Sequence, residues 1–130
     1  MIATLSIRES SYTPQAEEGQ PQRKPVPVLT ISGRLDASTV NILERALMRA
    51  LSSKEARTVI VDVGEVTYIS SSGLRVLLTA RRQVRERGGD ILLCSLTPNV
   101  RDVMSMVGFT TLFTVYEHIE EARRAAAQLA

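Results

Sequence analysis

The chain predicts an α/β fold in one domain, with a mixed, mainly parallel β-sheet of about five strands and about four α-helices. From Val26 onward, short runs of β-branched apolar residues alternate with longer segments whose apolar residues recur at helical spacing. Alternation of this kind joins parallel strands through helical crossovers. At 130 residues the chain also has enough length to bury a core without disulfides or metals.

The first two strands are expected to pair antiparallel around an insertion. Apolar residues roughly alternate with small or polar ones in 1–8, which predicts a short edge strand. Residues 10–25 hold Ser, Pro, Gln, Glu and Gly without apolar periodicity, so they predict a flexible insertion. Residues 26–32 alternate again and predict the second strand, which Gly33 is expected to end.

The first helix is expected to begin near Asp36 and Ser38, because both residue types favour helix starts. Residues 58–63 then form a nearly continuous apolar run, which is typical of a central strand covered on both faces. The apolar stripe of the first helix consists of Val40, Leu43, Leu47, Ala50 and Leu51.

The second half of the chain repeats the same alternation of helices and strands. Glycines and a proline mark where helices start and end. The predicted elements are a helix over 73–86 closed by Gly88 and Gly89, a strand over 90–96, a helix opened by Thr97 and Pro98 and ended by Gly108, a strand over 112–116 and a helix over 119–129.

Composition argues against several classes of partner. The net charge is only +2, and aromatic residues make up 4% with no Trp, which supplies little for stacking on nucleic acid. Cys94 is the single cysteine, so it can form neither an internal disulfide nor a thiolate metal cage, and we expect it in the core. No apolar run approaches the ~20 residues of a membrane span. We expect a cytoplasmic protein that binds no nucleic acid, membrane or metal.

Three consecutive hydroxyls, Ser70, Ser71 and Ser72, stand immediately before the helix that starts near Gly73. The carboxyl ends of neighbouring strands should bring them close to Asp36. Serine is a common helix cap, and on local chemistry alone a plain cap is the ordinary interpretation. The alternative is a phosphorylation site, because a helix N-terminus accommodates phosphate well.

Three segments stand out in order along the chain: residues 31–39 (ISGRLDAST), residues 59–78 (VIVDVGEVTYISSSGLRVLL) and residues 88–109. Together they resemble STAS domains of bacterial anti-sigma factor antagonists. Residues 59–78 resemble the family's signature, in which a strand precedes Asp-Ser-Ser/Ala-Gly-Leu at a helix start. Residues 31–39 resemble its Gly-x-Leu-Asp segment, and residues 88–109 resemble its next strand and helix. The resemblance covers essentially 26–130. It implies that residues 1–130 form a single STAS domain, with 10–25 as the insertion.

The resemblance also implies individual roles. The family's phosphorylated serine corresponds to Ser71, and Asp36 corresponds to the Asp of Gly-x-Leu-Asp near it. Ser70 departs from the family, which commonly has Asp there, and this departure leaves the efficiency of phosphorylation open. The implied partner-binding residues are Asp36, Ser70, Ser72, Gly73, Leu74 and Arg75.

By this resemblance the protein is a binding module and not an enzyme. When unphosphorylated it would bind an anti-sigma factor that is also a serine kinase, and so release a sigma factor. Phosphorylation of Ser71 would end binding, and a serine phosphatase would reset the switch. The ATP belongs to the kinase, so no cofactor is expected, and we expect a monomer or a weak dimer.

Two other functions would also use a serine at this position. A serine hydrolase would need Gly-x-Ser-x-Gly around Ser71, but Ile69 stands at the first glycine position and His118 is the only candidate base. No phosphate-binding glycine motif is present either. A STAS scaffold within a larger sensory complex would keep the same fold and serine, and size-exclusion chromatography would separate it from a small antagonist.

Overall fold

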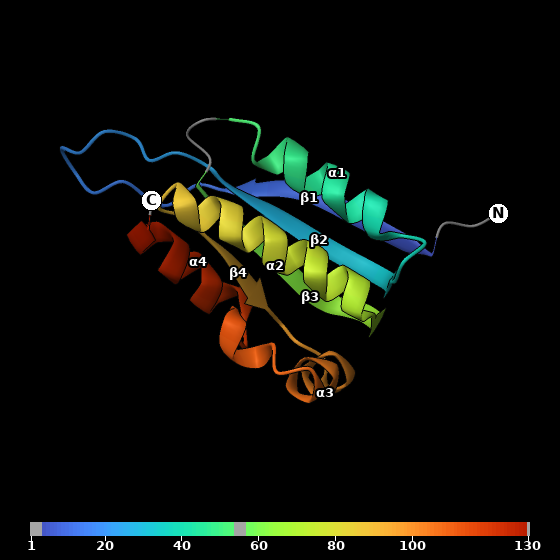
Figure 1. Ribbon diagram of the computed structural model, residues 1–130. Helices are drawn as coiled ribbons and strands as arrows, with labels where there is room; N and C mark the ends of the chain where they lie inside the picture. The colour runs from blue at the N-terminus through green and yellow to red at the C-terminus, as the bar shows by residue number, and fades with distance from the viewer. Residues whose placement is uncertain (1–3, 54–56, 130) are drawn as a thin grey trace.

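The computed structural model describes residues 4–53 and 57–129, which form a mixed five-stranded sheet in the order β1-β2-β3-β4-β5 (Figure 1). β1 pairs antiparallel with β2, and the other three pairings are parallel. This arrangement confirms the predicted class and the antiparallel first pair. The strands are β1 (Leu5–Tyr12), β2 (Val26–Leu35), β3 (Thr58–Ile69), β4 (Asp90–Cys94) and β5 (Thr114–Tyr116).

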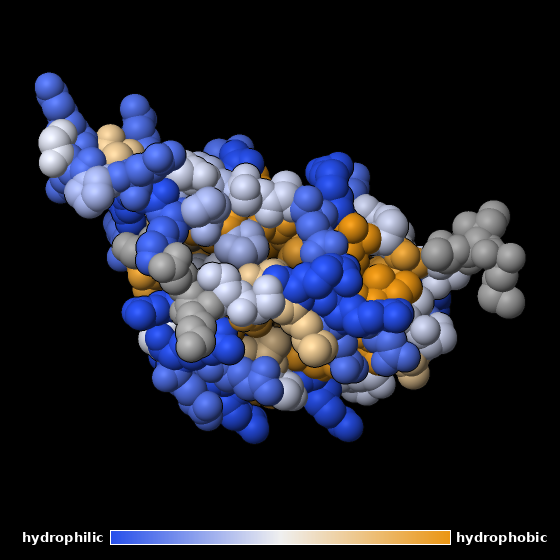
Figure 2. Space-filling view, turned by 90° about the horizontal axis from the view of Figure 1, so that it is seen from above, coloured by the Kyte–Doolittle hydropathy of each residue, from blue (hydrophilic) through white to orange (hydrophobic). Residues whose placement is uncertain are grey.

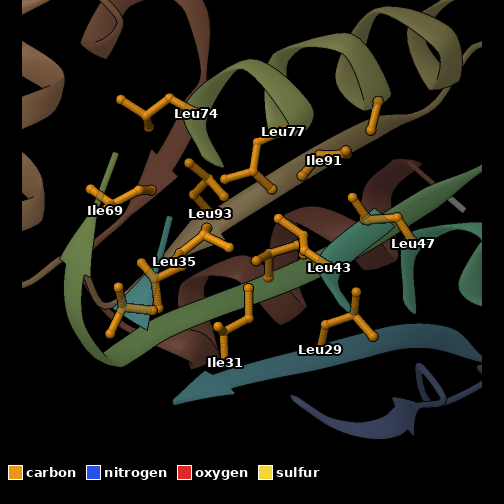
Figure 3. Close-up of a cluster of buried hydrophobic side chains, with 14 of the residues drawn as sticks. Leu29, Ile31, Leu35, Leu43, Leu47, Ile69, Leu74, Leu77, Ile91 and Leu93 are labelled. Atoms are coloured by element: carbon orange, nitrogen blue, oxygen red, sulfur yellow. The ribbon is translucent and has the colours of Figure 1, made fainter. Parts of the chain in front are cut away.

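Helices cover both faces of the sheet. The larger core lies between the sheet and α1 and α2, where Leu43, Leu77 and Leu93 are fully buried (Figure 3). A smaller core lies under α4, where Ile60 packs with Ala122. Successive residues of β3 therefore enter different cores, which explains its unbroken apolar run. The helices are α1 (Val40–Ala50), α2 (Ser71–Glu86), α3 (Pro98–Met106) and α4 (Ile119–Leu129), and a 3-10 turn, η1, spans Thr110–Leu112.

The predicted insertion begins too early. Residues Ser10 to Tyr12 belong to β1 and pair with Val28 to Val26, so the connecting segment starts only after Tyr12. Backbone pairing at an exposed edge needs no apolar side chains, which is why the pattern did not reveal it. Residues 1–3 of the predicted first strand lie outside the described residues.

Gly33 does not end β2, contrary to the prediction. It has φ +104, and a Cβ there would lie 2.1 Å from the Thr4 carbonyl oxygen. The parallel register shifts between Gly33 and Arg34, so the glycine accommodates a bulge and the strand continues to Leu35. β3 likewise continues beyond the predicted end to Ile69, which pairs with Leu35.

The remaining boundaries differ from the predictions for local reasons. β4 ends at Cys94 because Ser95 adopts a left-handed backbone with φ 66. β5 begins only after η1, which occupies the start of the predicted strand. Thr97 caps α3 with Pro98 in the first turn, as predicted. Cys94 is fully buried, as predicted, and burial raises the pKa of its thiol to about 11.

Candidate functional site

The carboxyl ends of β2 and β3 bring the two predicted site segments together. Arg34 is the register partner of Tyr68, and Leu35 is the partner of Ile69. The Ser70 N–H then donates a hydrogen bond to the Leu35 carbonyl oxygen at 2.9 Å. The start of α2 is thus joined directly to the end of β2, as the order of parallel strands predicts.

The three serines have different environments. Ser70 is the N-cap of α2, with φ −98 and ψ 169, and its hydroxyl accepts a hydrogen bond from the Gly73 N–H at 3.3 Å. Ser71 is the first helical residue and is exposed, and within the described residues its hydroxyl has no hydrogen-bond partner. Ser72 is half-buried. α2 therefore starts two residues before the predicted Gly73, and capping and exposure fall on different serines.

Gly73 and Leu74 fix the position of this helix start. A Cβ on Gly73 would lie 2.6 Å from the Leu35 Cγ atom, so the glycine permits close approach of α2 to β2. Leu74 is fully buried beside Ile69 in the larger core (Figure 3). This corrects the expectation that Leu74 contacts a partner, because a fully buried side chain offers no surface.

Asp36 organises the turn between β2 and α1. Its Oδ1 accepts hydrogen bonds from the Ser38 hydroxyl at 2.6 Å and the Ser38 N–H at 3.0 Å. The Thr39 hydroxyl donates to the Arg34 carbonyl oxygen at 2.9 Å and accepts from the Asp36 N–H at 2.9 Å. α1 starts only at Val40. Asp36 and Ser38 therefore shape a turn before the helix, and the predicted start was wrong by several residues.

The Ser38 hydrogen bonds, aided by the nearby Arg34 guanidinium and the Thr39 hydroxyl, lower the pKa of Asp36. We expect Ser38→Ala to raise the pKa of Asp36 back toward its ordinary value, because the hydroxyl bond is the largest cause. A carboxyl ¹³C NMR titration of wild type and variant measures the shift. An unchanged Asp36 pKa in Ser38→Ala would contradict this account of the turn.

Removal of the Ser70 cap should destabilise the domain. We expect Ser70→Ala to lower the free energy of unfolding by about 1 kcal/mol, because it leaves the Gly73 N–H without its acceptor. Ser70→Asp should retain the cap and add a favourable charge near the helix dipole, so it should be at least as stable as wild type. Urea denaturation of the three proteins tests both expectations, and an Ala variant as stable as the Asp variant would exclude the cap.

A cation–π pair lies beside the site, and the sequence analysis did not predict it. The Arg34 guanidinium lies 4.3 Å from the centre of the Tyr68 ring, and both side chains are exposed. The pair depends on the register of β2 and β3, which the sequence does not give. Arg75, one turn after Ser71, is also exposed and makes no hydrogen bond or ion pair within the described residues.

Nothing in residues 4–53 and 57–129 assembles a metal or hydrolase site. These residues contain no group of three or more His, Cys, Asp and Glu side chains able to hold a metal ion. Ser71 has no hydrogen bond to His118, the one base that the hydrolase hypothesis offered. Among the described helices, none has the length and apolarity to cross a membrane.

The fold and this site define a small α/β domain that presents an exposed hydroxyl at a capped helix start. The sequence model of the STAS domain matches residues 20–122. The chain belongs to the STAS domain family. This confirms the resemblance carried by residues 59–78.

Two of the similar proteins are named as anti-sigma factor antagonists. The chain is 37% identical over 98 residues to a "putative anti-sigma factor antagonist BtrV" of Bordetella bronchiseptica, covering 75% of this chain and 84% of the relative. An anti-sigma factor antagonist from Mycobacterium paratuberculosis has a similar structure, with a TM-score of 0.72 and 21% identity over 94% of this chain and 95% of that one.

A second similar structure is that of the Bacillus cell fate determinant SpoIIAA in its phosphorylated form. It has a TM-score of 0.59 and 18% identity over 89% of this chain and 99% of that chain. At this identity the likeness concerns the fold. The names of the relatives agree with the expectation that the chain is a binding module and not an enzyme.

Proposed function

We propose that this protein is an anti-sigma factor antagonist that binds an anti-sigma factor with serine kinase activity through the start of α2. Phosphorylation of Ser71 ends this binding, and a serine phosphatase restores it. The observation that carries the proposal is the position of Ser71, an exposed hydroxyl at the first residue of α2, directly after the cap. The antagonist names of the relatives support the same role.

The chemistry of the helix start supports such a switch. A phosphate on Ser71 would add about −1.5 to −2 charges at a point where the backbone N–H groups of α2 tolerate an anion. The free domain therefore accepts the modification without unfolding. A docked partner would have to desolvate that charge or oppose it, and either is costly. The unmodified surface docks and the phosphorylated surface does not.

Exposed and half-buried neighbours define the rest of the contact surface. Arg75 is exposed one turn after Ser71, and the half-buried Ser70 and Ser72 lie on either side of Ser71 in the chain. The half-buried Asp36 follows Leu35, whose carbonyl oxygen accepts from the Ser70 N–H. Ser70 makes the surface less acidic than the Asp common in the family, so a kinase that recognises this chain needs no cation opposite position 70. Sigma factor exchange of this kind would take place in the cytoplasm.

The test is a pull-down of the tagged chain from its own host, with phosphopeptide mass spectrometry of residues 58–75. We expect phosphate on Ser71 and a kinase-like anti-sigma factor retained mainly by the unphosphorylated form. Absence of phosphate under every growth condition would overturn the switch and leave the serines as a helix cap. A large assembly in size-exclusion chromatography would indicate the scaffold role instead.

A further inference from the structure

A groove runs between α1 and α2, on the face of the sheet that carries the larger core. The two helices lie side by side (Figure 1), and the groove between them has a volume of about 650 Å³. That volume falls within the range of about 300–1,000 Å³ typical of small-molecule sites. Its apolar lining consists of Leu47 and Met48 of α1, Leu51 directly after α1, and Val76, Ala80 and Val84 of α2.

The residues that line the groove favour an apolar ligand. Leu47, Ala80 and Val84 are buried and form a floor continuous with the core, while Met48 is 70% exposed at the rim. Methionine adapts readily to the shape of an apolar ligand. Hydrophobic residues also reach the surface between hydrophilic ones in the view from above (Figure 2).

Charge distinguishes the two ends of the groove. At one end Arg75 and Glu44 both line it, one turn from the start of their helices, and their opposite charges partly cancel. At the other end Arg87 donates one hydrogen bond to the Leu51 carbonyl oxygen at 3.2 Å. The other guanidinium donors of Arg87 have no partner within the described residues, and no described acidic residue lines that end.

We infer that this groove binds a single-chain carboxylate of the fatty-acid type. Its carboxylate lies on the Arg87 guanidinium, whose planar fork suits two parallel hydrogen bonds. Its alkyl chain follows the apolar floor toward Arg75. At ~1.5 Å per helical residue, the path from Arg87 to Arg75 is ~18 Å long, which accommodates a chain of medium length. This inference is independent of the proposed phosphorylation switch.

The probe is sodium dodecanoate, titrated below its micelle concentration into the ¹⁵N-labelled full chain. We expect saturable shifts confined to α1 and α2, whereas dodecyltrimethylammonium, with the opposite charge, should bind at least about tenfold more weakly. Arg87→Gln should weaken dodecanoate binding about tenfold, equivalent to ~1.4 kcal/mol. Arg82→Gln is the matched control, because Arg82 is an exposed arginine of the same helix outside the groove.

A second variant blocks the groove from its rim. Thr79 is exposed and lines the groove, so Thr79→Trp should abolish binding while the amide spectrum shows an intact fold. Three results would overturn the site: shifts that are absent or scattered over the protein, equal losses in Arg87→Gln and Arg82→Gln, or tight binding of the cation. Shifts at α1 and α2 that depend on protein concentration alone would show that a second copy of the chain fills the groove, and would also overturn it.

Discussion

Ser71→Asp should weaken binding to the partner kinase by about 100-fold, while Ser71→Ala should bind as tightly as wild type and resist release when ATP is added. A charge placed in a docked interface without a partner costs ~3 kcal/mol, which corresponds to about 100-fold in affinity. Alanine removes the only group that can carry the phosphate at this position and leaves the neutral surface intact. Calorimetry with the purified kinase, with and without ATP, measures both effects.

Loss of binding in Ser71→Asp must be separated from loss of structure. An acidic residue in the first turn of α2 should slightly stabilise the free domain, because it faces the positive end of the helix dipole. Thermal melting should therefore show Ser71→Asp at least as stable as wild type. Ser72→Ala serves as the neighbouring control and should remain a substrate for the kinase. Equal affinities of wild type and both Ser71 variants would exclude the switch.

The sequence predicted the fold class because apolar side chains report burial, and burial alternates with period two in strands and 3.6 in helices. The prediction from sequence failed where a strand continues through residues that have no apolar periodicity. Ser10 to Tyr12 form ladder pairs at an exposed edge, and Gly33 accommodates a bulge instead of a stop. Asp36 and Ser38 are polar turn formers, and the sequence alone does not separate a turn from a helix start.

In the candidate site, too, features set by neighbouring residues were predictable and features set by tertiary contacts were not. The run of serines before an apolar helix located the start of α2, because capping is a local property. Which serine is exposed follows from where the first turn of α2 begins, and that depends on the Leu35–Ser70 hydrogen bond between distant segments. The Arg34–Tyr68 pair and the groove beside Arg87 also need tertiary structure. The burial of Leu74, by contrast, was predictable, because Leu74 recurs with Leu77, Leu78 and Val84 at helical spacing in the sequence.

Gly89→Ala should be among the most destabilising single substitutions in this domain, at about 3 kcal/mol. A Cβ at Gly89 would lie 1.5 Å from the Arg57 carbonyl oxygen, which is a backbone atom that no rotamer change can move. The Asp90 N–H donates to that same oxygen at 3.1 Å, at the first register pair of β3 and β4. The methyl group would therefore separate two central strands or break their first hydrogen bond.

Gly88→Ala is the matched control, because it differs from Gly89→Ala in position by one residue. Gly88 has φ +86, so an alanine there is strained, but its Cβ would meet nothing within 4 Å. We expect a cost of about 1 kcal/mol from the left-handed backbone alone. Urea denaturation measures the free energy of unfolding of both variants, and unchanged m-values would make the two values comparable. Equal losses of stability in Gly88→Ala and Gly89→Ala would show that the close approach at Arg57 is not what constrains Gly89. Both glycines follow the end of α2, whereas Ser71 begins it, so whatever fraction of Gly89→Ala remains folded should still bind the kinase with wild-type affinity.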